Sequence, residues 1–173
     1  MQFRVAFLAL APAAIASPAF ATTYLTVPQA QAQMFPGATL SADAHTLTDA
    51  QVAAIQRDSG VNVLSRTLHA WRASTGGWFI VDEVVGKHEF ITIALALDAQ
   101  GAVRDLEILD YRESYGYQVR DTGWRAQFVG AHHGAPLALG RQIRNISGAS
   151  LSCRHVTDGV RRLLSTYAIV LAN

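Results

Sequence analysis

Six residues from Ser147 to Ser152, in the order Ser-Gly-Ala-Ser-Leu-Ser, place hydroxyls and small side chains directly before a long amphipathic run. Free backbone N–H groups and the positive end of the helix dipole meet at a helix N-terminus, which suits a phosphate group. Gly148 and Ala149 leave room for a ligand to approach the backbone. Because Ser is also a common N-cap residue, the spacing alone favours an ordinary helix start over a phosphate site.

The elements around this segment follow from its hydrophobic pattern. Apolar and polar residues alternate from Ile143 to Ile146, which predicts a short strand. A final helix is predicted from about Ser150 to Leu171, and Cys153 lies on its apolar stripe, so a buried inert thiol is favoured over a reactive thiolate. The stripe also contains Val156, Val160, Leu163, Leu164 and Tyr167. The polar remainder of the helix includes Arg154, Asp158, Arg161 and Arg162.

The middle of the chain reads as consecutive strands joined by short turns, which predicts an antiparallel sheet. One strand is expected within residues 61–71, and three more span residues 78–85, 90–97 and 103–111. Two helices precede them. The first covers residues 29–35 after a capping Thr26, and the second follows the capping-box pattern Thr48-Asp49-Ala50-Gln51. The predicted fold is therefore α+β, with flanking helices on an antiparallel sheet in a single domain, residues 22–173.

Residues 1–21 have the features of a secretory signal peptide. Arg4 precedes the apolar run Val5 to Ile15, and Ala19-Phe20-Ala21 is a small-x-small cleavage site. Cleavage predicts a periplasmic location outside the inner membrane, whereas an uncleaved N-terminus would act as an anchor. With a single cysteine in 173 residues, the chain cannot hold covalently attached c-type haem or a cysteine-ligated iron–sulfur cluster. The formal net charge of +1 gives no indication of nucleic-acid binding.

A loop that mixes charge, hydroxyl and aromatic groups follows the last predicted strand, over residues 112–117. A sheet holds such a loop in place, which makes it a binding candidate, although a plain surface turn has the same composition. Trp124 and Phe128 follow on a short helix, at a spacing that more often indicates core packing than a cofactor wall. His132 and His133 have no acidic residue or cysteine nearby at ligand spacing, so no metal site is predicted.

Three motifs in order carry a resemblance to a known family: Gly86-Lys87-His88-Glu89, Tyr111 to Gly116, and Ile146 to Ser152. Together they resemble the FMN-binding domain family of extracytoplasmic flavoproteins. Its members include flavin-carrying periplasmic subunits of the sodium-pumping quinone reductase and of similar membrane electron-transfer complexes. The most specific similarity runs from about Lys87 to Leu164, and the run Val156 to Arg161 adds to it.

The resemblance implies that FMN binds with its phosphate at the Ser147–Ser150 turn. In the family the last hydroxyl of this turn can carry FMN through a phosphoester that a flavin transferase installs. Ser150 stands here where the family usually has Thr, a mild change because serine has the same nucleophilic oxygen. Arg144 stands where the family motif starts with an acidic residue, which puts recognition by the transferase in doubt. Since Arg144 can pair with a free phosphate dianion, covalent and non-covalent FMN are equally expected.

Other residues are expected around the flavin ring by the same resemblance. Tyr115, Tyr117 and Trp124 are candidates for its apolar walls, and Glu113 and Ser114 for contacts to the ribityl chain or the ring edge. The cofactor site implied by the resemblance comprises Lys87, Glu113, Ser114, Tyr115, Gly116, Arg144, Ser147, Gly148, Ala149, Ser150, Leu151 and Ser152.

The function that follows is that of an electron carrier with a membrane-bound redox protein as partner. No general acid–base pair or activated nucleophile stands out, so no catalytic residue is predicted. A cofactor-less binding or regulatory module on the same scaffold is the alternative, and Arg144 is the feature that favours it.

Overall fold

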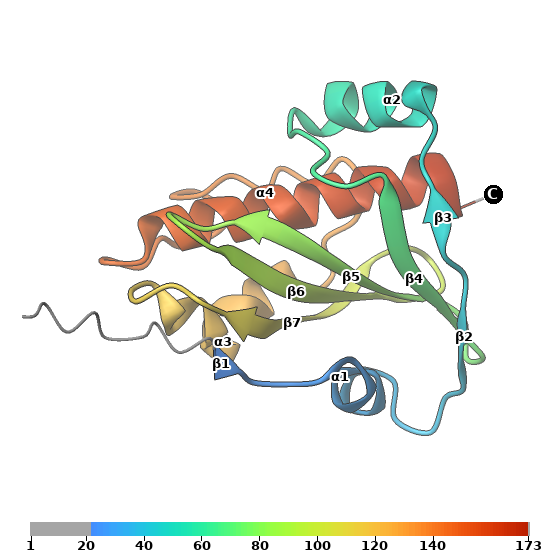
Figure 1. The fold of residues 1–173 in the computed structure, drawn as a ribbon, viewed down its shortest axis with the longest axis horizontal. Coiled ribbons are helices and arrows are strands. Elements are labelled where there is room, and N and C mark those ends of the chain that lie inside the picture. Colours follow the sequence, from blue (N-terminus) through green and yellow to red (C-terminus); the bar gives the residue numbers. More distant parts are fainter. Residues whose placement is uncertain (1–21, 173) are drawn as a thin grey trace, which may run out of the picture.

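The computed structural model describes residues 22–172, which form an α+β domain around an antiparallel sheet (Figure 1). The predicted signal peptide, residues 1–21, lies outside the described residues. The strand order is β1-β7-β6-β5-β4-β2, and β3 pairs with β4 as a seventh strand. The strands are β1 (Thr22–Thr23), β2 (Leu40–Ala42), β3 (His45–Thr46), β4 (Thr67–Ala73), β5 (Trp78–Val85), β6 (Phe90–Leu97) and β7 (Val103–Tyr111). The predicted fold class is thereby confirmed.

The central strands follow the alternation of their sequence. β5 pairs with β6 from Trp78 opposite Leu97 to Val85 opposite Phe90, without a register shift. Every second residue of β6, from Ile91 to Leu97, is fully buried in the larger core cluster. Gly101 has φ +80° in the turn to β7, a conformation that glycine adopts without steric cost. The boundaries predicted for these three strands are confirmed.

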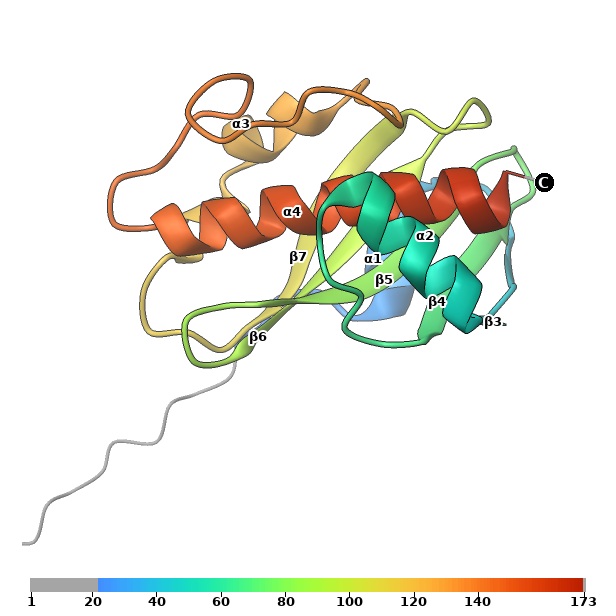
Figure 2. The same ribbon diagram turned by 90° about the horizontal axis from the view of Figure 1, so that it is seen from above.

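Four α-helices flank the sheet: α1 (Val27–Met34), α2 (Asp49–Ser59), α3 (Thr122–Arg125) and α4 (Ser150–Thr166). α4 crosses one face of the sheet with α2 beside it, and α1 covers part of the opposite face (Figures 1 and 2). A π-helical turn, Tyr167–Leu171, continues α4, and the short 3₁₀ turns Tyr117–Arg120 and Ala126–Phe128 flank α3. Both α1 and α2 begin with a complete capping box, at Thr26 and Thr48.

The position of α4 depends on a close approach to the sheet at Gly159. A Cβ atom at this position would lie 2.4 Å from Val84 Cγ1 and 3.3 Å from Ile93 Cδ1. Only glycine therefore allows the helix axis to come this near to β5 and β6. With the helix held there, its first turn lies beside the end of β7, because Ser152 contacts Tyr111.

One expectation from the sequence is wrong, and two features of the structure were not predicted. Residues 143–146 do not form a strand, and the only pairing there is an isolated parallel bridge between Leu139 and Ile143. The short strands β1, β2 and β3 were not predicted, because two or three residues give no alternation to detect. Arg162, which belongs to the polar remainder of the last helix, is buried at 4% exposure, and this burial was not predicted. Within residues 22–172, no helix has both the length and the apolar character needed to cross a bilayer.

Candidate flavin site

A cavity of about 280 Å³ lies where three segments meet: the β5–β6 turn, the loop after β7 and the first turn of α4. These segments are distant in sequence, and each of them contains a different one of the three motifs that predicted the site. The cavity is lined by Lys87, Glu113, Tyr115, Gly148, Ala149, Ser150, Leu151 and Ser152. Eight of the twelve predicted site residues therefore line one cavity.

The N-terminus of α4 is the feature of this cavity that suits an anion. Ala149 is the N-cap residue and no side chain caps the helix, in contrast to α1 and α2. Ser150, Leu151 and Ser152 are the first three helical residues, whose N–H groups have no partner within a helix. The helix dipole adds positive potential at the same point. All three residues line the cavity, so their amides could hold a phosphate group there.

The two walls of the cavity are held together by the hydroxyl of Tyr111. This hydroxyl donates to the carbonyl oxygen of Tyr115 and lies 2.8 Å from Ser152 Oγ. Gly116 fits tightly beside them at φ +95°, because an added Cβ would lie 2.5 Å from both hydroxyl oxygens. Burial raises the pKa of Tyr111, as does the nearby charge of Glu113, against the effect of the hydrogen bond with Ser152. The group therefore stays neutral and keeps its proton as a hydrogen-bond donor.

Replacing Tyr111 with phenylalanine is expected to lower the free energy of unfolding by about 1 kcal/mol, because the buried hydroxyl of Ser152 and the carbonyl oxygen of Tyr115 lose their partner. FMN affinity should fall with it, since the loop wall is no longer tied to α4. Chemical denaturation and FMN titration measure the two effects. Tyr117→Phe is the control, because Tyr117 is 55% exposed. Equal stability of the Tyr111→Phe and Tyr117→Phe variants would contradict the role of Tyr111.

The carboxylate of Glu113 binds the backbone of the turn that carries Lys87. Its Oε1 accepts hydrogen bonds from the amides of His88, at 2.5 Å, and Glu89, at 3.0 Å. Burial raises the pKa of Glu113, but the backbone hydrogen bonds and the nearby His88 outweigh it and hold the pKa below its usual range. Glu113 therefore fixes one wall of the cavity in addition to lining it.

Ser150 is exposed at the cavity, and its hydroxyl oxygen accepts a hydrogen bond of 2.9 Å from Asn145 Nδ2. Asn145 and Tyr111 are the two polar contacts of the site whose roles were not predicted. Strict alternation along β7 would place Tyr111 on the same face as Leu109. A register shift between Thr92 and Ile93 instead brings Tyr111 opposite Ile91 and into the larger core cluster, which the alternation does not reveal. No pattern in the sequence indicates that Asn145 reaches the hydroxyl of Ser150.

Several predicted residues lie outside the cavity lining. Arg144 is exposed, and its backbone is fixed through Trp124 Nε1 and Gln127 Oε1. Trp124 is fully buried against Phe128, so the expectation that it forms a flavin wall is wrong. The other predicted residues that do not line the cavity are Ser114, Gly116, Tyr117 and Ser147.

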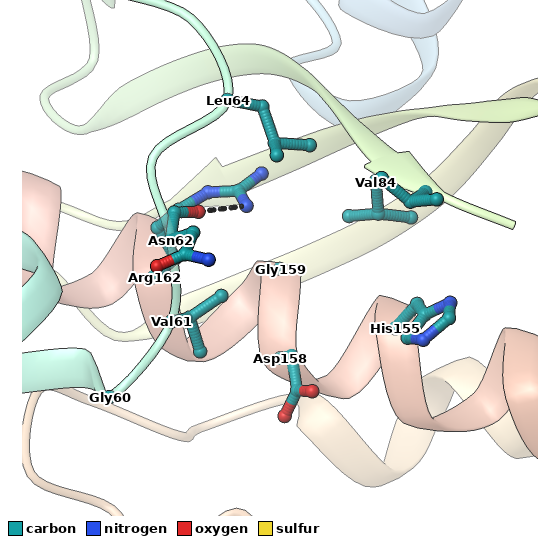
Figure 3. Close-up of a pocket in the computed structure, with 10 residues that line it drawn as sticks. Gly60, Val61, Asn62, Leu64, Val84, His155, Asp158, Gly159 and Arg162 are labelled. Carbon is teal, nitrogen blue, oxygen red and sulfur yellow. Dashed lines mark hydrogen bonds between the residues drawn. The ribbon is translucent and has the colours of Figure 1, made fainter.

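A second cavity of about 300 Å³ lies farther along α4, below residues 60–64 (Figure 3). Its one guanidinium belongs to Arg162, which already binds the carbonyl oxygens of Asn62 and Glu83 and the carboxylate of Asp82. Because these partners occupy the cation, it is not available for a phosphate. The cavity at the first turn of α4 is therefore the better candidate.

Comparison with known proteins agrees with this placement. The family model described as an FMN-binding domain matches residues 86–165. That range begins at the turn of Lys87 and ends within α4, so it includes all three cavity walls. No curated protein matches the chain in a sequence comparison. The match identifies residues 86–165 as a domain of the FMN-binding domain family, with FMN as its cofactor.

Proposed function

We propose that this protein is an extracytoplasmic electron carrier, which exchanges electrons with a membrane-bound redox partner through FMN held at the first turn of α4. The uncapped helix N-terminus that faces Lys87 across a cavity is the observation that carries the flavin placement. The signal-like residues 1–21 support the extracytoplasmic location.

The proposed phosphate site uses the amides of Ser150, Leu151 and Ser152, with Lys87 as the cation opposite. Gly148 has φ +83° and no atom within 4 Å of a Cβ position, so the backbone there is open to the cavity. FMN therefore fits the residues present: they supply N–H donors, a cation and an unobstructed approach.

The proposed position for the ring is the mouth of the cavity. The cavity of about 280 Å³ is slightly smaller than typical pockets that enclose a whole ligand, which start at about 300 Å³. Tyr115 is 83% exposed and Leu151 is 47% exposed, so both offer apolar surface there. When bound, FMN supplies one- and two-electron redox chemistry. A ring held near the surface is accessible to a redox partner, as a carrier requires.

Ser150 is the proposed attachment point if a flavin transferase moves FMN from a flavin dinucleotide: the bond between Ser150 Oγ and phosphorus forms, the pyrophosphate bond of the dinucleotide breaks, and a nucleoside monophosphate leaves. The Nδ2 group of Asn145 orients the Ser150 oxygen while leaving its proton free to be removed. The same amides suit a free phosphate, so the geometry is compatible with either mode of binding.

The Ser150→Ala variant is expected to lose all covalently held flavin, because it removes the hydroxyl oxygen proposed as the attachment point, on the first residue of α4. The matched control is Ser147→Ala, which removes an exposed hydroxyl of the same turn outside the cavity lining. Intact mass after co-expression with a flavin transferase measures the adduct. A flavin adduct that persists in Ser150→Ala would contradict attachment at this residue.

The visible spectrum of the purified protein tests the wider proposal. A carrier should show flavin absorbance, and either a mass adduct or FMN released by acid. If neither the adduct nor released FMN appears, the carrier function is wrong and a cofactor-less module takes its place.

A further inference from the structure

Besides the hydroxyl of Tyr111, the carboxylate of Glu113 also ties two segments of the cavity together, because it contacts the β5–β6 turn. Its Oε1 accepts from the amides of His88 and Glu89. The turn closes on itself through the Gly86 N–H to Glu89 carbonyl bond, at 2.7 Å. A Cβ at Gly86 would lie 2.4 Å from Glu113 Oε1 and 2.6 Å from the carbonyl oxygen of Glu89, so a glycine is needed where the carboxylate meets the turn. The turn and the carboxylate are therefore fitted to each other from both sides.

This contact connects Lys87 to the rest of the cavity. Lys87 lies between Gly86 and the two amides that Glu113 binds, so fixing these amides fixes the backbone of Lys87. The loop that carries Glu113 is in turn held to α4 by Tyr111 and Ser152. A cation on an untethered hairpin turn would have no defined position relative to the amides of α4.

We propose that Glu113 is a positioning residue, which holds Lys87 at the phosphate site only while its carboxylate is ionised. This inference rests on the proposed flavin placement and adds a pH dependence to it. The charged or titratable groups around the carboxylate are His88, Lys87 and Glu89 on the turn and Tyr111 and Arg112 at the end of β7. An ionised acceptor binds two amides more strongly than a neutral one.

The sign of the pH effect follows from the lowered pKa of Glu113. A group whose pKa is lower in the folded state than in the unfolded state stabilises the folded state when the pH is above its unfolded pKa. This contribution is lost as the pH falls through its folded pKa. The turn should therefore be held in place at neutral pH and released only as the pH falls through the folded pKa of Glu113, which lies below the ordinary value of 4.5.

The test uses Glu113→Gln, which removes the charge from the contact, and Gly86→Ala, which crowds both the carboxylate and the turn. Glu83→Gln is the control, because it removes one exposed negative charge on β5 without touching the turn. All proteins are made without a flavin transferase. Hydrogen exchange of the His88 and Glu89 amides is measured in flavin-free protein, and the Kd of FMN is measured from pH 3.5 to pH 8.

Both variants are expected to exchange these two amides faster than the wild type, while Glu83→Gln does not. Glu113→Gln should bind FMN roughly tenfold more weakly at pH 7, as loss of a charge-assisted pair of hydrogen bonds implies. The Kd of FMN for Glu113→Gln divided by the Kd for the wild type should approach one when the pH is below the folded pKa of Glu113. Titration of the FMN phosphate occurs with both proteins and cancels in this ratio.

Unchanged amide exchange in Glu113→Gln, or a Kd ratio that is independent of pH, would overturn the inference. A wild type that binds no FMN, although its two amides are protected and those of Glu113→Gln are not, would instead refute the proposed flavin site. The positioning of the turn by Glu113 would stand in that case. The two failures are thus distinguishable.

Discussion

Gly148→Val is expected to abolish FMN binding of either kind. Gly148 lines the cavity and has φ +83°, a conformation that costs a β-branched residue about 1–2 kcal/mol. No atom lies within 4 Å of its Cβ position, so the protein has room for the Cβ of a valine. It would instead enter the space through which the phosphate reaches the amides of α4. The protein should fold and remain colourless.

Gly134→Val is the matched control for this experiment. Gly134 has φ +82° and also has no atom within 4 Å of its Cβ position, but it does not line the cavity. The two variants therefore share the backbone cost and differ only in what the side chain obstructs. Stoichiometric flavin in Gly148→Val, measured as absorbance per protein, would show that the phosphate binds elsewhere.

Arg162→Met is expected to lower the free energy of unfolding by about 3–5 kcal/mol, the cost of leaving a buried ion-pair partner alone. The guanidinium binds Asp82 at 2.7 Å and the carbonyl oxygens of Asn62 and Glu83 at 3.0 and 2.8 Å. Its side chain is 5% exposed and that of Asp82 is 21% exposed, so solvent screens the pair little. Methionine fills much of the volume but leaves three acceptors without their donor.

Chemical denaturation measures this loss, with Arg154→Met as the control on an exposed position of the same helix. A loss below 1 kcal/mol for Arg162→Met would show that the network adds little to stability. FMN affinity of the folded Arg162→Met variant should be unchanged, because Arg162 lines the cavity of Figure 3 and not the candidate flavin site.

The parts of the fold that could be predicted are those in which local pattern and tertiary environment agree. β6 alternates because one of its faces packs under α4, and the bounds of β5 and β6 follow from their turn residues. The capping box at Thr48 is a local device that a sequence displays directly. The apolar stripe of α4 predicted its buried face, including the inert Cys153, whose pKa is raised by burial.

The parts that could not be predicted depend on contacts between distant segments. Arginine is usually exposed, and Arg162 can be buried because its guanidinium binds Asp82 and the carbonyl oxygen of Asn62. The hydrogen bonds of Glu113 join residues 24 and 25 positions apart, which no local pattern encodes.

Addition of FMN to ¹⁵N-labelled protein, made without a flavin transferase, tests the central claim most directly. The claim predicts that the largest amide chemical-shift changes occur at Ser150, Leu151 and Ser152, with smaller ones at Lys87 and Glu113. Changes confined to residues around the second cavity, such as Val61 and His155, with the first turn of α4 unaffected, would contradict it.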